Sequence, residues 1–161
     1  MEHFPVRKRI RLPLPVYTQG HAFFITIATH QKYPWFSLYP KLGDAVIQII
    51  RDLASVRGTK VYAWCIMPDH IHLLVQDHEV VSFVRLFKGR LTPRAREIEP
   101  GRRLWQRSFY DHALRKEESV AEIACYIWEN PVRKGTIDDP TQYEWSGSEV
   151  FPDWKELYGR G

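Results

Sequence analysis

The sequence predicts an α+β fold, in which one antiparallel sheet carries helices. Apolar residues recur at helical spacing in two stretches, residues 41–57 and 80–91. Two apolar stretches rich in strand-forming residues, 60–66 and 70–75, are separated by only three residues (67–69). A connection this short requires the two strands to be antiparallel. The predicted order is strand, helix, two strands, helix, strand, helix, which is the ferredoxin-like βαββαβ arrangement with an added C-terminal helix.

The first predicted elements follow a basic segment. Residues 1–20 contain several prolines and basic side chains, and we expect an extended arm. Residues 21–29 (HAFFITIAT) combine aromatic and β-branched residues and predict the first strand. Residues 30–40 contain two prolines and predict a loop, after which the helix of 41–57 is expected to end at Gly58.

The middle of the chain holds the second helix and the fourth strand. The helix that begins at residue 80 is expected to end before Pro93, because proline cannot donate the helical hydrogen bond. The basic stretch up to Arg103 predicts a loop. Residues 104–115 (LWQRSFYDHALR) predict a strand, although their apolar alternation is imperfect.

The last predicted helix begins at Ser119. Ser119 and Glu122 have the spacing of a capping box, and Asn130-Pro131 is expected to stop the helix. The tail that follows, with its tryptophans, predicts irregular structure packed on the domain. The predicted organisation is a basic extended arm (1–20), one folded domain (21–145) and a C-terminal tail (146–161) packed on or extending from that domain.

Composition places the chain among globular proteins. The 161 residues suffice for one domain with a substantial core, since 44% are hydrophobic and 14% aromatic. No apolar run approaches the ~20 residues that cross a bilayer, and the polar N-terminus has no signal-peptide core. We therefore expect a cytoplasmic protein without a membrane partner. Cys65 and Cys125 lie in apolar segments and are expected to be buried.

Basic charge is concentrated in one stretch of the chain. The formal net charge is +4, whereas residues 85–107 hold eight basic and two acidic side chains, a local excess of +6. Together with the basic arm, this excess favours a polyanionic partner, most simply nucleic acid. The alternative is a solvated basic face that binds nothing.

Two histidines begin the strand of residues 70–75. Side chains at i and i+2 of a strand share a face, so His70 and His72 are expected to project together. The residues between and after them, Ile71, Leu73 and Val75, would then face a core. Two converging imidazoles form half of a divalent-metal site. Alternatively, they are two polar residues at a strand start, each solvated or hydrogen-bonded.

Tyr126 and Asn130 are neighbours, at i and i+4, on the border of the apolar face of the last helix. This border could abut the histidine face of the sheet. The Asn130 amide oxygen would then be a third metal ligand, and the Tyr126 phenol a nucleophile toward a phosphodiester that the metal polarises. The alternative for Tyr126 is an ordinary aromatic residue at an interface.

Three segments, in order, resemble those of the HUH superfamily of single-tyrosine transposases, of insertion-sequence type. MPDHIHLLV resembles the HUH motif, and LWQRSFYDHALR is similar to the Trp-Gln…Phe…His strand of that family. YIWENPVRKG (126–135) resembles the Tyr-Ile-x-x-Asn-Pro-Val-Lys-x-Gly segment that carries the nucleophile. Order and spacing agree from about Tyr17 to Trp145. On these motifs the chain is identified as a member of the REP-associated tyrosine transposases, with residues 21–145 as the catalytic domain.

The resemblance implies an activity. His70, His72 and Asn130 would bind Mg²⁺ or Mn²⁺, although imidazoles would also tolerate zinc. Tyr126 would attack single-stranded DNA beside a short palindromic hairpin, leaving a 5′-phosphotyrosine and a free 3′-OH, and rejoining would need no ATP. A tetranucleotide 5′ of the hairpin would guide recognition. A monomer is favoured, with a homodimer as the other arrangement.

The resemblance also frames the expected DNA contacts. Arginine replaces the usual lysine at position 133, and Glu129 adds a negative charge that could alter metal or DNA binding. Trp105 and Phe109 could stack on bases or pack in the core. The side chains expected to contact DNA are Arg7, Lys8, Arg9, Arg11, Lys88, Arg90, Arg102, Arg103, Arg107, Tyr110, Arg133 and Lys134.

Other assignments are weaker. Tyr110 is the rival nucleophile, but its predicted strand offers no amide at i+4. His112 could orient a phosphate, although a structural hydrogen bond is favoured. A histidine-triad nucleotide hydrolase would need a third histidine where this chain has Leu74. A hairpin-binding module without catalysis is the remaining alternative to the nuclease.

Overall fold

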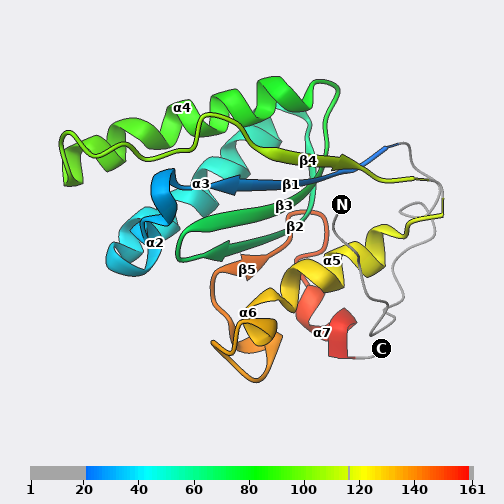
Figure 1. The fold of residues 1–161 in the computed structure, drawn as a ribbon. Coiled ribbons are helices and arrows are strands. Elements are labelled where there is room, and N and C mark those ends of the chain that lie inside the picture. Colours follow the sequence, from blue (N-terminus) through cyan, green and yellow to red (C-terminus); the bar gives the residue numbers. More distant parts are fainter. Residues whose placement is uncertain (1–20, 116, 160–161) are drawn as a thin grey trace.

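The computed structural model describes residues 21–115 and 117–159, which form a five-stranded sheet with helices on both faces (Figure 1). The strand order is β4-β1-β3-β2-β5, and each neighbouring pair is antiparallel. The first four strands have the ferredoxin-like order, so the predicted α+β class is confirmed. The strands are β1 (Phe23–Ala28), β2 (Lys60–Met67), β3 (His70–Gln76), β4 (Tyr110–Ala113) and β5 (Ser146–Gly147).

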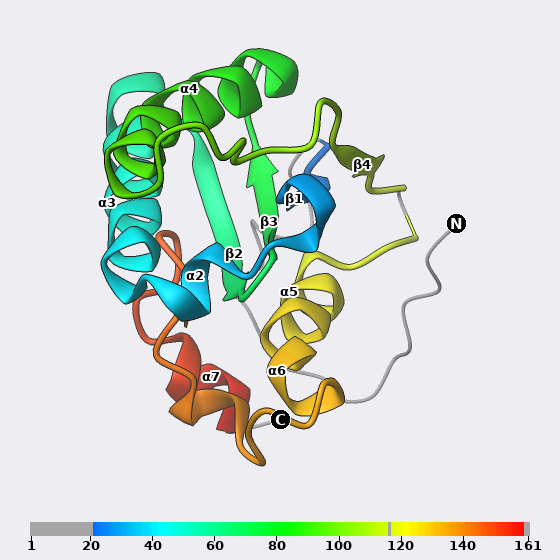
Figure 2. The same ribbon diagram turned by 60° about the vertical axis from the view of Figure 1, so that its left-hand side comes forward.

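The helices divide between the two faces of the sheet (Figures 1 and 2). α3 (Pro40–Arg57) and α4 (Val80–Ile98) cover one face, and α5 (Val120–Trp128) packs on the other with the C-terminal elements. Each face therefore has its own apolar core. The shorter helices are η1 (His30–Lys32), α2 (Trp35–Leu38), α6 (Asn130–Arg133), η2 (Pro140–Gln142) and α7 (Trp154–Gly159).

Successive side chains of β3 point alternately into these two cores. Ile71, Leu73 and Val75 are fully buried in the core under α3 and α4, as the sequence predicts. Leu74 belongs to the other core, beneath α5. The histidines share the face of Leu74, because side chains two residues apart in a strand point the same way.

Pro93 does not end the second helix, contrary to the prediction. α4 continues to Ile98 with Pro93 inside it. Leu91 and Ala95, one helical turn apart, are both buried in the α3–α4 core. Burial of this stripe on both sides of the proline compensates for the backbone hydrogen bond that Pro93 cannot donate.

The fourth strand is shorter than the predicted residues 104–115. β4 begins only at Tyr110, and Trp105 forms a single isolated bridge with Thr29. Leu104 and Trp105 insert into the α3–α4 core instead. The chain thus leaves the sheet edge after residue 106 and returns at 110, which explains the imperfect alternation.

The C-terminal part of the chain is more regular than predicted. The Ser119 side chain accepts hydrogen bonds from the backbone of Ala121 (3.1 Å) and Glu122 (3.4 Å) and caps α5 as expected. Beyond α5 the chain contains α6, η2, β5 and α7, of which β5 and α7 lie in the tail predicted to be irregular. α7 is held by Trp154, which stacks on Trp128 at 4.5 Å between ring centroids.

Two further predictions concern burial and membranes. Cys65 and Cys125 are both buried, as expected. Within the part of the chain that the structure describes, no helix is both long and apolar enough to traverse a bilayer.

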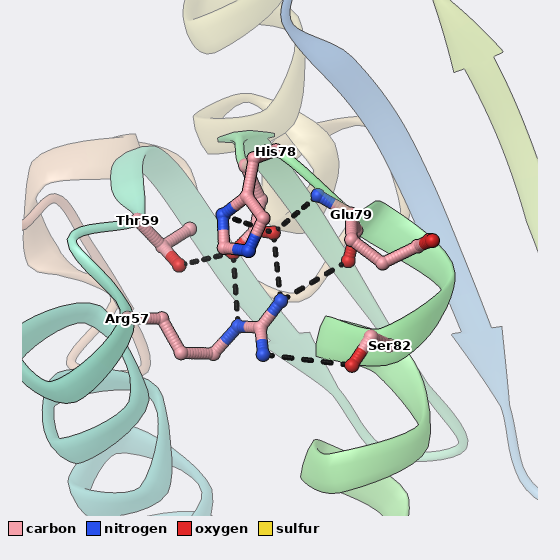
Figure 3. A network of polar contacts seen from close by, with 6 residues as sticks. Arg57, Thr59, His78, Glu79 and Ser82 are labelled. Atoms are coloured by element: carbon pink, nitrogen blue, oxygen red, sulfur yellow. Dashed lines mark hydrogen bonds and ion pairs between the residues drawn. The ribbon is translucent and has the colours of Figure 1, made fainter.

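A buried ion pair fixes the end of β3 (Figure 3). The Arg57 guanidinium, at the end of α3, donates two hydrogen bonds to the Asp77 carboxylate, at 3.0 and 2.8 Å. Thr59 and the backbone of Glu79 also donate to this carboxylate, whose side chain is fully buried. Arg57 reaches on to the carbonyl of Glu79 and to Ser82. The network therefore joins α3, β2, β3 and α4 at one corner.

This network predicts a dependence of stability on Asp77. Burial would raise the pKa of the Asp77 carboxyl, but the hydrogen bonds from Arg57, Thr59 and Glu79 outweigh burial and lower it to about 2. Asp77→Asn leaves the Arg57 guanidinium without its charged partner. We expect it to lower the free energy of unfolding by about 3 kcal/mol at neutral pH, measured by urea denaturation.

The pH dependence has a definite sign. A depressed folded-state pKa contributes stability that is present above the unfolded-state pKa of about 4 and is lost as the pH falls toward about 2. The difference between wild type and Asp77→Asn should therefore shrink over this window. Asp52→Asn, on the exposed face of α3, is the control and should cost less than about 0.5 kcal/mol. Equal effects of the two substitutions would contradict the role of the network.

Candidate metal and nucleophile site

The two histidines lie together on the α5 face of β3, as predicted. The ring centroids of His70 and His72 are 4.7 Å apart, and the planes meet at 75°. His72 is 7% exposed, whereas the side chain of His70, at the first position of the strand, is 20% exposed. One imidazole is thus enclosed and the other is partly exposed to solvent.

Both rings are held through Nδ1. Asp69 accepts a hydrogen bond from Nδ1 of His70 at 2.6 Å, and Nδ1 of His72 lies 2.9 Å from the hydroxyl of Thr26. Burial, and then the positive charges of His70, Arg133 and Lys134, lower the pKa of His72 to about 3. His72 is consequently neutral at neutral pH, which is the state in which an imidazole binds a metal.

Asn130 reaches this face of the sheet from the start of α6. Its side chain is buried, and its amide nitrogen has no hydrogen-bond partner among the described residues. The amide oxygen lies 3.4 Å from an Arg133 nitrogen. α6 follows directly after α5, and α5 contacts β3, the strand of the imidazoles.

These donors suit a divalent cation. Two adjacent imidazoles and a buried carboxamide form a nitrogen and oxygen set that accommodates Mn²⁺ or Mg²⁺ with water or phosphate oxygens completing the shell. In residues 21–115 and 117–159, no three His, Cys, Asp or Glu side chains cluster as a cation site. Asn130, a carboxamide and so outside these four residue types, remains the third ligand that the sequence predicts.

Tyr126 lies one turn before Asn130 and is partly buried. The Arg133 guanidinium lies over its ring, 3.8 Å from the centroid, and donates a hydrogen bond to its backbone carbonyl at 2.7 Å. The ring of Phe24 contacts Tyr126 edge-on at 6.2 Å and stacks on His72 at 5.4 Å. The phenol and the buried imidazole therefore share one aromatic neighbour.

Three other residues singled out in the sequence surround this cluster. Tyr110 is 38% exposed and also meets Phe24 edge-on, at 6.2 Å. His112 bonds to the Glu118 carboxylate at 2.9 Å, a structural contact. Glu129 accepts a hydrogen bond from Tyr158 of α7 at 2.7 Å, so its carboxylate is engaged by the C-terminal helix.

A basic groove lies on the other side of the sheet, between α4 and the loop after it. Its volume is about 580 Å³. Its lining includes predicted DNA contacts, namely Lys88, Arg102, Arg103 and Arg107, together with Arg96. Arg90 is exposed on α4, and Arg7, Lys8, Arg9 and Arg11 lie outside the described residues.

Not every basic side chain in the groove is equally available. Lys88 donates to the carbonyls of Gln106 (2.9 Å) and Ser108 (3.3 Å), and burial and the charge of Arg103 lower its pKa. Arg102 pairs with Glu99 at 2.8 Å and lies over the ring of Tyr33. These two side chains mainly hold the loop against the domain.

Sequence reasoning missed three neighbours of the site. Phe24, Thr26 and Asp69 contact the imidazoles, but only strand pairing brings the first two there. Thr26 stands directly opposite His72 in the β1–β3 register, and Phe24 opposite Leu74. Asp69 precedes His70 in the chain, so its adjacency was the one available signal.

Comparison with known proteins points to one family. The family model described as "Transposase IS200 like" matches residues 20–130. A Haemophilus influenzae protein, provisionally named a REP-associated tyrosine transposase, is 31% identical over 162 residues, covering 86% of this chain and 89% of that protein. The REP-associated tyrosine transposase of Escherichia coli is 25% identical over 136 residues, covering 81% of this chain and 78% of its own.

A solved structure shares the fold. It is described as a REP-associated tyrosine transposase bound to a REP hairpin, and it superposes with a TM-score of 0.64 over 98% of this chain and 88% of that chain, at 23% identity. The family match spans β3 with its two histidines, the edge strand β4 and the helix α5, which carries Tyr126. The chain therefore belongs to the IS200-like transposases, in the group of REP-associated tyrosine transposases.

Proposed function

We propose that this transposase is a metal-dependent endonuclease and strand transferase that acts on single-stranded DNA beside short hairpins through a phosphotyrosine intermediate. The observation that carries the proposal is the shared contact of Phe24 with His72 and Tyr126, which gives the buried imidazole and the tyrosine ring a common neighbour. The name of the superposed structure, which is bound to a REP hairpin, supports a hairpin as the DNA partner.

His70, His72 and Asn130 are the residues that would hold Mg²⁺ or Mn²⁺. When bound, the cation supplies charge stabilisation at the scissile phosphate. The Tyr126 oxygen attacks phosphorus and forms a 5′-phosphotyrosine bond. The bond to the 3′ oxygen breaks, and that oxygen leaves as a 3′-OH. Attack by another 3′-OH reverses the step and releases the phenol, so no ATP is consumed.

Arg133 orients the nucleophile in this proposal. Its guanidinium covers one face of the Tyr126 ring and holds the backbone carbonyl of the same residue. A fixed cation beside the phenol also favours an anionic phosphate there. Because Tyr126 and His72 of one chain already share Phe24, a single chain could complete the site, which supports a monomer as the active species.

The basic groove and the histidine–tyrosine site lie on opposite faces of the sheet. The edge strand β4 and the residues just before it run from one to the other. Arg107 lines the groove, and Tyr110, three residues later, contacts Phe24 in the site. We propose that the groove binds the phosphate backbone and that the single strand continues past this edge to Tyr126.

The identity of the nucleophile is tested by trapping the covalent adduct. Wild-type protein, incubated with labelled hairpin DNA and Mn²⁺, should give a protein–DNA adduct that survives denaturing electrophoresis. Tyr126→Phe should give none, because it lacks the attacking oxygen, whereas Tyr110→Phe should retain it. An adduct with Tyr126→Phe but not with Tyr110→Phe would transfer the nucleophile role to Tyr110.

The metal requirement is tested with cleavage and binding measured side by side. Chelation by EDTA, or His70→Gln, should reduce cleavage by at least about 100-fold, because charge on the phosphate is no longer stabilised. Hairpin affinity, measured by fluorescence anisotropy, should change less than about threefold. Cleavage that persists in EDTA would contradict metal dependence. Hairpin binding by the wild type without cleavage in any divalent metal would favour the non-catalytic module.

The groove is tested through the salt dependence of binding. Arg107→Gln should weaken hairpin binding and lower the slope of log affinity against log salt by about 1, the effect of one lost phosphate contact. Arg85→Gln is the matched control. Arg85 is an exposed arginine like Arg107, but it lies on α4 outside the lining of the groove. Equal slopes for the two variants would exclude the groove as the phosphate-binding surface.

A further inference from the structure

The two imidazoles are oriented by partners on different elements. The His70 ring is bonded by Asp69, in the turn between β2 and β3, and the His72 ring by Thr26 of β1. In both cases the bonded atom is Nδ1. The two Nε2 atoms are the ring nitrogens left for another ligand.

The turn that carries Asp69 is fixed by its backbone. The Asp69 carbonyl accepts hydrogen bonds from the Thr29 backbone (2.9 Å) and hydroxyl (3.0 Å). The Pro68 carbonyl accepts another from the backbone of Phe36 at 3.1 Å. The turn is thus anchored without its carboxylate, and that side chain is directed at His70.

Thr26 has an equally defined position. It is the direct cross-strand partner of His72, and its other strand neighbour is Tyr110. Phe24 stacks on the His72 ring with an angle of 25° between the planes. Packing by Phe24 and bonding by Thr26 together hold the ring in one orientation.

Hydrogen-bond chemistry then decides where the ring protons lie. A neutral imidazole carries one N–H, and a carboxylate can only accept, so Nδ1 of His70 must be the protonated nitrogen. A hydroxyl can donate or accept, and it accepts when Nδ1 of His72 carries the proton. Both rings can then present bare Nε2 atoms on the same face.

We propose that Asp69 and Thr26 are positioning residues that keep both imidazoles protonated at Nδ1, so that both Nε2 lone pairs can bind one divalent cation. The inference rests on the proposed function for the nature of that ligand. Partners of this kind raise the basicity of a ligand and fix its orientation, and their loss typically weakens metal affinity 10- to 100-fold.

The experiment measures tautomers and metal affinity separately. Long-range ¹H–¹⁵N NMR spectra of the metal-free protein, at mildly alkaline pH, should show Nδ1–H for His70 and His72. Asp69→Ala should give His70 as a mixture of tautomers, and Thr26→Val should do the same for His72. Calorimetry with Mn²⁺ should show affinity about 10- to 100-fold weaker in each variant.

The conservative variants are Asp69→Asn and Thr26→Ser. Each keeps an oxygen that can accept from Nδ1, so each should retain more of the Nδ1–H tautomer than Asp69→Ala or Thr26→Val does. Asp111→Ala, exposed on β4, is the matched control and should bind Mn²⁺ as the wild type does. Thermal unfolding of every variant checks that the fold is retained.

The possible failures are distinguishable. Nε2–H tautomers in the wild type, or unchanged Mn²⁺ affinity in both Asp69→Ala and Thr26→Val, would overturn the positioning role while leaving the nuclease proposal intact. Absence of Mn²⁺ binding by the wild type would overturn the proposed metal site. In that case the tautomers of the metal-free protein would still decide whether Asp69 and Thr26 orient the rings.

Discussion

The pleat of β3 is the constraint on which the site depends. This strand lies in the middle of the sheet, with Ile71 and Leu73 pointing into one core and His70 and His72 pointing to the other face. A shift of one residue would exchange the two sets and would put imidazoles into the core under α3 and α4. Pairing with both β1 and β2 prevents such a shift. The strand register that builds the core therefore also places the imidazoles.

Both ends of β3 are also anchored, by different chemistry. At the end near α4, Asp77 is buried with Arg57, and its charge is retained because hydrogen bonds outweigh the cost of burial. At the start of the strand, backbone hydrogen bonds hold the turn before His70. Burial has the opposite effect on His72. It lowers the pKa of the imidazole, so the ring is neutral where Asp77 is charged. The residue that follows the strand is thus an anion that stabilises the fold, while the strand itself carries a neutral imidazole.

The C-terminal elements complete the site by covering the second sheet face. α5 buries its apolar stripe there, and α7 packs behind it through the stacked Trp128 and Trp154. Tyr126 and Asn130 lie at the edge of this packing, where Arg133 contacts both. The basic groove is on the opposite face of the sheet from this cluster.

The sequence by itself determined the local features: the order of β1 to β4 with α3, α4 and α5, the shared face of His70 and His72, the cap at Ser119, and the motifs that indicate the family. These follow from periodicity and spacing over a few residues. Only the tertiary structure decided that α4 continues through Pro93, that the chain leaves the sheet between residues 106 and 110, and that Phe24 and Thr26 stand beside the imidazoles. Core packing can outweigh a local helix breaker, and strand register joins residues that are far apart in the chain. Neither effect is visible in a stretch of sequence, because both depend on the free energy of contacts between distant segments.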